Sequence, residues 1–172
     1  MRLPATSPGD VLSYGEMCQI EGAHLQRGMN FRLRGGLSVV LMSVQPNTPY
    51  ADALEDEGRT LIYEGHSAPL SLDCSHPDEL DQPARLPSGR LGQNGLFHEV
   101  AERFKRGEEV AELVKVYEKL RSGIWIFNGT FRLTTHGKRN RASAACGSFA
   151  SNWLKKRREK RSMRPLWLSC RA

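Results

Sequence analysis

Apolar residues occur along the chain in short runs whose length and composition are typical of β-strands. The run LSVVLMSV at residues 37–44 is continuous, apolar and β-branched, which predicts a buried strand. Three further runs predict strands: RTLIYEG at 59–65, ELVKVYEKL at 112–120 and GIWIFNGTFRL at 123–133. The second of these also fits a continuation of the helix that precedes it.

Two segments have the period of an amphipathic helix. The clearer one is GLFHEVAERFKRG at 95–107, which ends at a glycine, and the shorter one lies within GDVLSYGEMCQIEGAH at 9–24. The apolar positions of the clearer segment share one helix face: Leu96, Phe97, Val100, Ala101 and Phe104. One or two helices among several strands predict an α+β fold with a mostly antiparallel sheet or barrel.

The connections are rich in glycine and proline. GAHLQRGMNFRLRGG at 22–36 combines glycines with arginines, which predicts a loop or two short strands that expose cations. Residues 66–93 form a proline-rich segment that we expect to be a long surface loop. Its last residue, Gln93, and the next residue, Asn94, either take part in ligand binding or cap the helix that follows, and we favour the cap.

Length and composition describe an ordinary globular protein. The chain has 172 residues, enough for one domain, and is 39% hydrophobic and 26% charged. No apolar run approaches the roughly 20 residues of a membrane helix, and the first residues do not have the pattern of a signal peptide, so we expect an intracellular protein. The four cysteines form no CxxC pair, which predicts reduced thiols and neither a zinc site nor a disulfide framework.

The formal charge is distributed unevenly. Residues 1–134 hold 14 Lys and Arg against 18 Asp and Glu, a net −4, while residues 135–172 hold 11 against 1, a net +10. Beyond Thr134 the hydrophobic period also disappears. A one-base slip in the gene near codon 134 would explain this break, since restoring one base permits a translation with an acidic loop and an alternating strand. The alternative is a genuine basic arm that neutralises phosphates.

Six motifs follow one another in the order GAHLQRGM, GGLSVVLM, YADALEDEG, LIYEG, GQNGLF and FNGTFRL. With these motifs the chain resembles the SRA domain, also called YDG, of the PUA-like barrels that bind modified cytosine. It is most similar to the N-terminal domain of bacterial restriction endonucleases that join such a domain to an HNH nuclease. The resemblance implies an α+β, PUA-like SRA domain over residues 15–134: a twisted, mostly antiparallel β-barrel with one or two flanking helices. Residues 1–14 would be an N-terminal extension and residues 135–172 a basic tail.

The resemblance also implies a pocket for an extruded base, made by Tyr50, Asp52, Asp56, Tyr63, Glu64 and Gly65. The residue types suit this task, because extrusion of a base costs a few kcal/mol and stacking on aromatic rings, worth roughly 1–3 kcal/mol per base, can offset that cost. A carboxylate accepts from the cytosine N4 amino group, and Asp52 is our first choice for that acid and Asp56 the second. The alternative is that Tyr63 is a packed strand residue and that the acids are simply solvated.

Two further sets of residues come from the resemblance. A DNA-contacting loop is implied for Gln26, Arg27, Gly28, Asn30, Arg32 and Arg34. Gln26 or Arg27 has the length to fill the gap left by a flipped base, while the arginines either bind phosphates or are ordinary surface residues. The family's Tyr-Asp-Gly signature turn corresponds to Phe127, Asn128 and Gly129, which depart from it at the first two positions.

The implied function is binding of double-stranded DNA that contains 5-methyl- or 5-hydroxymethylcytosine, by base flipping. The chain would be the specificity domain of a modification-dependent, type IV HNH restriction endonuclease whose nuclease domain lies outside it. We therefore expect no catalytic residues, metal or cofactor in this chain. The resemblance further implies the bacterial cytosol or nucleoid as its location, no membrane partner, and compatibility with a homodimer.

Two other functions are consistent with the residues. Asp52 and Asp56 with His24 or His66 would bind a metal in a small phosphoesterase or nuclease. A PUA-like RNA-binding module is the second alternative.

Overall fold

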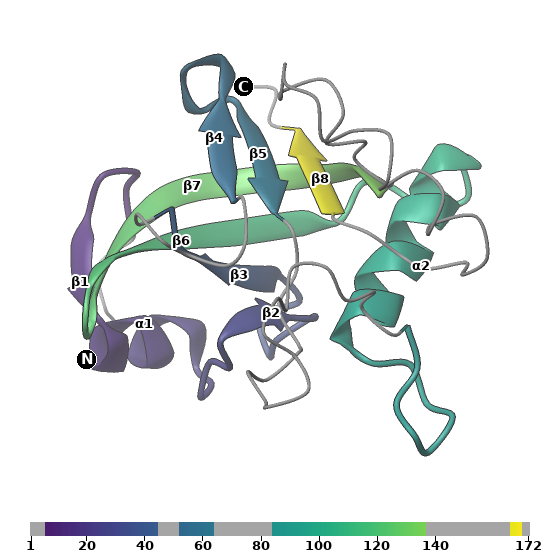
Figure 1. The fold of residues 1–172 in the computed structure, drawn as a ribbon, viewed down its shortest axis with the longest axis horizontal. Helices are drawn as coiled ribbons and strands as arrows, with labels where there is room; N and C mark the ends of the chain where they lie inside the picture. Colours follow the sequence, from purple (N-terminus) through teal and green to yellow (C-terminus); the bar gives the residue numbers. More distant parts are fainter. Residues whose placement is uncertain (1–5, 45–51, 64–83, 137–165, 170–172) are drawn as a thin grey trace, which may run out of the picture.

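The computed structural model describes residues 6–44, 52–63, 84–136 and 166–169 (Figure 1). Two α-helices are present in these ranges, α1 (Tyr14–Glu21) and α2 (Gln93–Lys105), with a short 3-10 turn, η1 (Asp56–Gly58). The strands are β1 (Val11–Ser13), β2 (Gly28–Asn30), β3 (Ser38–Met42), β4 (Ala53–Glu55), β5 (Thr60–Tyr63), β6 (Leu113–Arg121), β7 (Ile124–His136) and β8 (Leu166–Ser169).

The strands form one sheet in the order β2-β3-β6-β7-β8-β5-β4, with β1 pairing to β7. Among the described pairs only β3 and β6 run parallel, and the others are antiparallel. The predicted α+β class, the mostly antiparallel sheet and the two flanking helices are therefore confirmed. ELVKVYEKL forms β6, so it is a strand and not a continuation of the helix.

The sheet curls around a core. β3 and β5 lie far apart in the pairing order, yet Val40 and Met42 belong to the same buried cluster as Leu61 and Tyr63. α2 adds Phe97 and its neighbours to that cluster, while the long strands β6 and β7 cross the body of the molecule (Figure 1). Side-chain packing thus brings the two ends of the sheet together, which gives the fold its barrel-like curvature.

A second cluster lies on the other face of β3. Val39 and Leu41 pack there with Met17 of α1 and with Tyr117 and Phe127. Because successive side chains of a strand point to opposite faces, β3 is buried on both sides. This double burial is the physical reason for the continuous apolar run at 37–44.

α1 begins and ends at residues suited to those positions. The side chain of Ser13 accepts from the backbone N–H of Glu16 at 3.3 Å, and the Glu16 carboxylate accepts from the Ser13 backbone N–H at 2.7 Å, which is a capping box. Gly22 ends the helix in the left-handed conformation, with φ of 62°. The helix is fixed to β6 by Glu21, whose buried carboxylate accepts from Lys115 Nζ and from the Tyr117 hydroxyl.

Phe127, Asn128 and Gly129 lie inside β7 and not in a turn, which corrects our expectation. Val116 pairs with Gly129 and Tyr117 pairs with Phe127, so Asn128 is the extra residue of a β-bulge. Gly129 has φ of 109°, which side chains disfavour, and Asn128 Nδ2 donates to Glu118 at 2.9 Å. The bulge therefore requires the glycine of the motif but neither the tyrosine nor the aspartate.

Part of the basic tail joins the sheet. Leu166–Ser169 forms β8, which pairs with β7 on one side and with β5 on the other. The slip near codon 134 stays a prediction, because the origin of these residues is a property of the gene.

Candidate functional site

An open cavity of about 530 Å³ lies where the end of β3, the residue before β4, the end of β5 and the β6–β7 turn meet α1 and the loop before β2. Its volume is within the range of small-molecule and cofactor sites. The cavity is lined by Tyr14, Leu25, Arg27, Gly28, Leu41, Met42, Ser43, Asp52, Tyr63, Lys119, Ser122, Gly123 and Trp125.

Asp52 and Tyr63 both line this cavity, as the predicted base pocket requires. Asp52 is half-buried, and its Oδ2 accepts from the backbone N–H of Ser43 at 3.3 Å, which fixes the carboxylate against the end of β3. Tyr63 ends β5 and is 1% exposed, so most of its ring is packed in the core. The sequence offered a base-pocket residue and a packed strand residue as alternatives for Tyr63; in the structure it is packed in the core and also borders the cavity, and its role toward a base stays a prediction.

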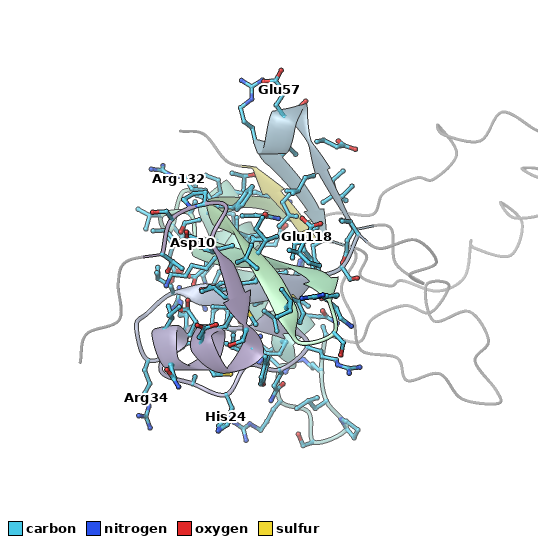
Figure 2. The ribbon with its side chains drawn as sticks, turned by 90° about the vertical axis from the view of Figure 1, so that its left-hand side faces the viewer. Asp10, His24, Arg34, Glu57, Glu118 and Arg132 are labelled. Carbon is cyan, nitrogen blue, oxygen red and sulfur yellow. The ribbon has the colours of Figure 1, made fainter. Side chains whose placement is uncertain are left out.

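Asp56 lies elsewhere. It belongs to η1, at the tip of the β4–β5 hairpin, where it is exposed and adopts φ of 52°. Its Oδ2 accepts from the Thr60 hydroxyl at 2.6 Å, and its neighbour Glu57 marks the tip in Figure 2. Of the two acids that the sequence left open, only Asp52 borders the cavity.

The predicted DNA-contacting loop divides into structural and exposed residues. Asn30 is buried and fixes the loop, because its Oδ1 accepts from Gln26 N at 2.7 Å and its Nδ2 donates to Gln26 O at 2.9 Å. Gln26 and Arg27 are exposed, and Arg27 lines the cavity beside Gly28. Arg34 points away from the body of the protein (Figure 2).

Arg32 has carboxylate partners within the protein. Its Nε donates to Glu112 at 3.0 Å, its Nη2 lies 3.5 Å from Glu109, and its guanidinium lies over the ring of Phe31. Glu112 is buried and also accepts from the Ser38 hydroxyl at 2.7 Å. Arg32 thus neutralises a buried acid, which leaves less of its charge for a ligand.

Gln93 has a structural role that differs from the predicted one. Gly92 is the N-cap of α2, without a side-chain capping bond. The Gln93 Oε1 atom instead accepts from the backbone N–H of Phe31 at 2.8 Å, so it joins the helix to the end of β2.

Several predicted residues lie outside the described ranges, namely Tyr50, Glu64, Gly65 and His66. Conversely, the cavity contains Tyr14, Lys119 and Trp125, which the sequence did not indicate. Arg121-Ser122-Gly123 between two strand patterns was a usable signal, because a Ser-Gly turn predicts a hairpin that pairs Arg121 with Ile124 and so brings Lys119 and Trp125 close together; a register shift between Lys119 and Arg121 then pairs Lys119 directly with Trp125.

Tyr14 is a hydrogen-bond donor at the edge of the cavity. Its hydroxyl donates to the backbone carbonyl of Leu25 at 2.6 Å. The side chain of Cys18, and then burial, raise the pKa of this hydroxyl, so it stays protonated at neutral pH. Tyr14 therefore holds the loop before β2 against α1.

The metal-dependent alternative requires acids and histidines to meet. Asp52 borders the cavity, Asp56 lies at the hairpin tip, and His24 is an exposed residue that points away from the body (Figure 2). Over the described ranges, no group of three or more His, Cys, Asp or Glu side chains could hold a metal ion. Neither described helix is long and apolar enough to cross a bilayer.

Comparison with known proteins gives a structural answer. No protein-family model and no curated protein matches the chain. Among solved structures, it is similar to the SUVH5 SRA domain bound to methylated CHH DNA, with a TM-score of 0.56 and 15% identity over 99% of this chain and 92% of that one. The SUVH5 SRA domain bound to fully hydroxymethylated CG DNA gives a TM-score of 0.57 and 16% identity, with the same coverage.

KRYPTONITE, in complex with mCHH DNA, an H3(1-15) peptide and SAH, is also similar, with a TM-score of 0.56 and 15% identity. That match covers 99% of this chain and 33% of the longer one. At these identities the similarity is one of architecture. Together with the curled sheet and its two flanking helices, it shows that this chain has the fold of the SRA domains.

Proposed function

We propose that this protein binds double-stranded DNA containing 5-methyl- or 5-hydroxymethylcytosine and holds the modified base, flipped out of the duplex, in the cavity beside Asp52 and Tyr63. The observation that carries the proposal is the convergence of an acid, an aromatic ring and two cations, Arg27 and Lys119, on one cavity of an SRA fold. The described SUVH5 structures, which contain methylated or hydroxymethylated DNA, support the ligand class.

Each group has a defined task in this proposal. Base extrusion costs a few kcal/mol, and stacking on an aromatic ring returns roughly 1–3 kcal/mol per base. Tyr63 supplies such a ring at the cavity wall, and Trp125 is a second aromatic residue of the lining. The Asp52 carboxylate accepts from the cytosine N4 amino group, which thymine lacks.

The wider context is also a proposal. The chain would be the specificity module of a type IV, modification-dependent restriction endonuclease of the bacterial cytosol, with an HNH nuclease outside this chain. A homodimer is compatible with this role. The motif order from GAHLQRGM to FNGTFRL supports the assignment.

The test compares Asp52→Asn with Asp56→Asn, the first and the second choice from the sequence for the acid of the pocket. The amide keeps the shape of Asp52 and an oxygen that can accept from Ser43 N, but it loses the charge and adds an NH₂ donor where cytosine also presents a donor. Since a good base-edge contact contributes about 1–3 kcal/mol, Asp52→Asn should weaken binding of the modified duplex, whose cytosine is flipped into the cavity, by roughly 5- to 150-fold. Asp56→Asn should leave it unchanged. The measurement is fluorescence anisotropy with methylated, hydroxymethylated and unmodified duplexes of one sequence.

A second variant tests the aromatic wall. Tyr63→Leu keeps an apolar side chain in the core but removes the flat ring, whereas Tyr63→Ala would leave a cavity that costs about 3–5 kcal/mol of stability. Preference for the modified duplex should fall while nonspecific binding persists. Equal preference in wild type, Asp52→Asn and Tyr63→Leu would refute the pocket, and stronger binding of single-stranded RNA than of any duplex would favour an RNA-binding module instead.

A further inference from the structure

The β6–β7 turn, defined here as residues 119–123, is part of the cavity wall. Lys119, Ser122 and Gly123 line the same cavity as Asp52 and Tyr63. Lys119 is paired with Trp125 across the hairpin, and its side chain is neither fully exposed nor fully buried. The resemblance implied a DNA-contacting loop at 26–34, and the β6–β7 turn is a different element that borders the same cavity.

The charges of the site indicate what the turn can do. A flipped nucleotide remains attached to its backbone, so a phosphate must lie near the mouth of any pocket that holds the base. Among the described lining residues, the acid Asp52 repels that phosphate, while the cations Arg27 and Lys119 attract it. Arg32, the cation expected nearby from sequence, is already paired with Glu112 and Glu109.

The chemistry of lysine favours a phosphate over a base edge as the ligand of Lys119. Its ammonium is a compact and strongly hydrated charge on a flexible stem, which suits a partly exposed phosphate at the rim. Planar, two-point recognition of a base edge instead favours a guanidinium or an amide.

We propose that Lys119 binds a backbone phosphate of the flipped nucleotide, which makes the β6–β7 turn a DNA-binding element that is separate from the loop at 26–34. This inference rests on the proposed function and adds a residue that fixes the nucleotide without selecting the base. Arg121, exposed in the same turn, adds positive charge beside it.

The experiment measures the salt dependence of binding for wild type, Lys119→Gln and the control Lys105→Gln. Lys105 lies at the end of α2, which contributes no residue to the lining of the cavity, and its replacement removes the same charge. Loss of one phosphate contact should reduce the slope of log K against log salt by about 0.9. Wild type should therefore lose roughly threefold more affinity than Lys119→Gln between 50 and 200 mM salt. The ratio of the affinities for the methylated and the hydroxymethylated duplex, both of which present a flipped nucleotide, should be the same in all three proteins.

The outcomes separate this inference from the proposed function. Suppose that wild type prefers the modified duplex and that Lys119→Gln has the same slope of log K against log salt as wild type. The phosphate contact of Lys119 would then be wrong, while the proposed base pocket would remain. A changed ratio of the affinities for the methylated and the hydroxymethylated duplex in Lys119→Gln would also overturn it, because the lysine would then contact the base. If wild type itself shows no preference, the proposed function fails and the role of Lys119 fails with it. Circular dichroism and urea unfolding verify that each variant is folded.

Discussion

Replacement of Tyr117 by phenylalanine removes one buried hydroxyl that joins α1 to the sheet. Tyr117 is fully buried in β6, and its hydroxyl donates to Glu21 Oε1. The Glu21 side chain is only 6% exposed and also accepts from Lys115 Nζ at 2.9 and 3.1 Å. The Tyr117 ring packs on Phe127 with centroids 5.1 Å apart, a contact that phenylalanine preserves.

The structure sets the size of the effect. A hydrogen bond to a charged group contributes about 1.5–3 kcal/mol. Because Lys115 still binds Glu21 in the variant, the carboxylate is not left without a partner, and we expect a loss at the low end, about 1.5 kcal/mol. With a urea m-value of about 1–3 kcal/mol/M, the unfolding midpoint should fall by roughly 0.5–1.5 M at neutral pH.

Alkaline pH gives an independent check. Burial, and then the Glu21 carboxylate, raise the pKa of Tyr117 well above its ordinary value of 10. Above pH 10 the unfolded chain releases this proton while the folded chain keeps it, so wild-type stability falls with rising pH by at most about 1.4 kcal/mol per pH unit. The Tyr117→Phe variant has no such proton. The difference in stability between the two proteins should therefore be full below pH 10 and shrink above it.

Lys115→Met is the companion variant. It leaves Glu21 buried with only the tyrosine as donor, and removal of one member of a buried ion pair costs about 3–5 kcal/mol, so it should destabilise more than Tyr117→Phe. Equal midpoints for Tyr117→Phe and wild type at neutral pH, or parallel alkaline profiles, would refute the proposed contribution of the Tyr117–Glu21 bond.

Three further substitutions test local features of the fold by urea unfolding. Ser13→Ala should cost about 1 kcal/mol by removing the helix cap. Because the Ser13 side chain lowers the pKa of Glu16, the part of this difference that comes from the Glu16 carboxylate should be present above pH 4.5 and be lost as the pH falls through the acid range, while the part from the backbone cap bond remains. Gly95→Ala should destabilise by about 2 kcal/mol even though alanine is the better helix former, because its Cβ would lie 2.2 Å from the carbonyl oxygen of Ala84. Gly129→Ala should cost about 1–3 kcal/mol, because φ of 109° at the β7 bulge is strained for any residue with a side chain. If any of the three variants unfolds at the same urea concentration as wild type, the structural reason given for that variant is wrong.

The sequence predicted which segments form strands and helices better than it predicted irregularities within them. The period-2 and apolar runs placed β3, β5, β6 and β7, and the 3.6-residue period placed α2. These signals are local, because each follows from which side chains one element buries. The bulge at Asn128 was missed, since two residues opposite one is a property of two strands in register and not of one strand alone.

The candidate site was predictable only in part. The sequence named Asp52, Tyr63 and Arg27 through the order of motifs, and the structure brings all three to one cavity. It ranked Asp52 above Asp56 without excluding Asp56, because two residues four positions apart lie on the same face of a helix or of a strand, so that either carboxylate could face the pocket. The choice depends on the β4–β5 hairpin, whose tip carries Asp56 away from the cavity.

By itself, the sequence determined the α+β class, most of the elements and the kind of chemistry that the acids and aromatic residues can perform. The tertiary structure alone decided which charged residues meet at the cavity. Arg32 is paired with Glu112, 80 positions further along the chain, whereas Lys119 reaches the cavity because the β6–β7 hairpin returns beside α1. Coulomb attraction depends on distance in space, and the curl of the sheet sets those distances between residues that no local pattern relates.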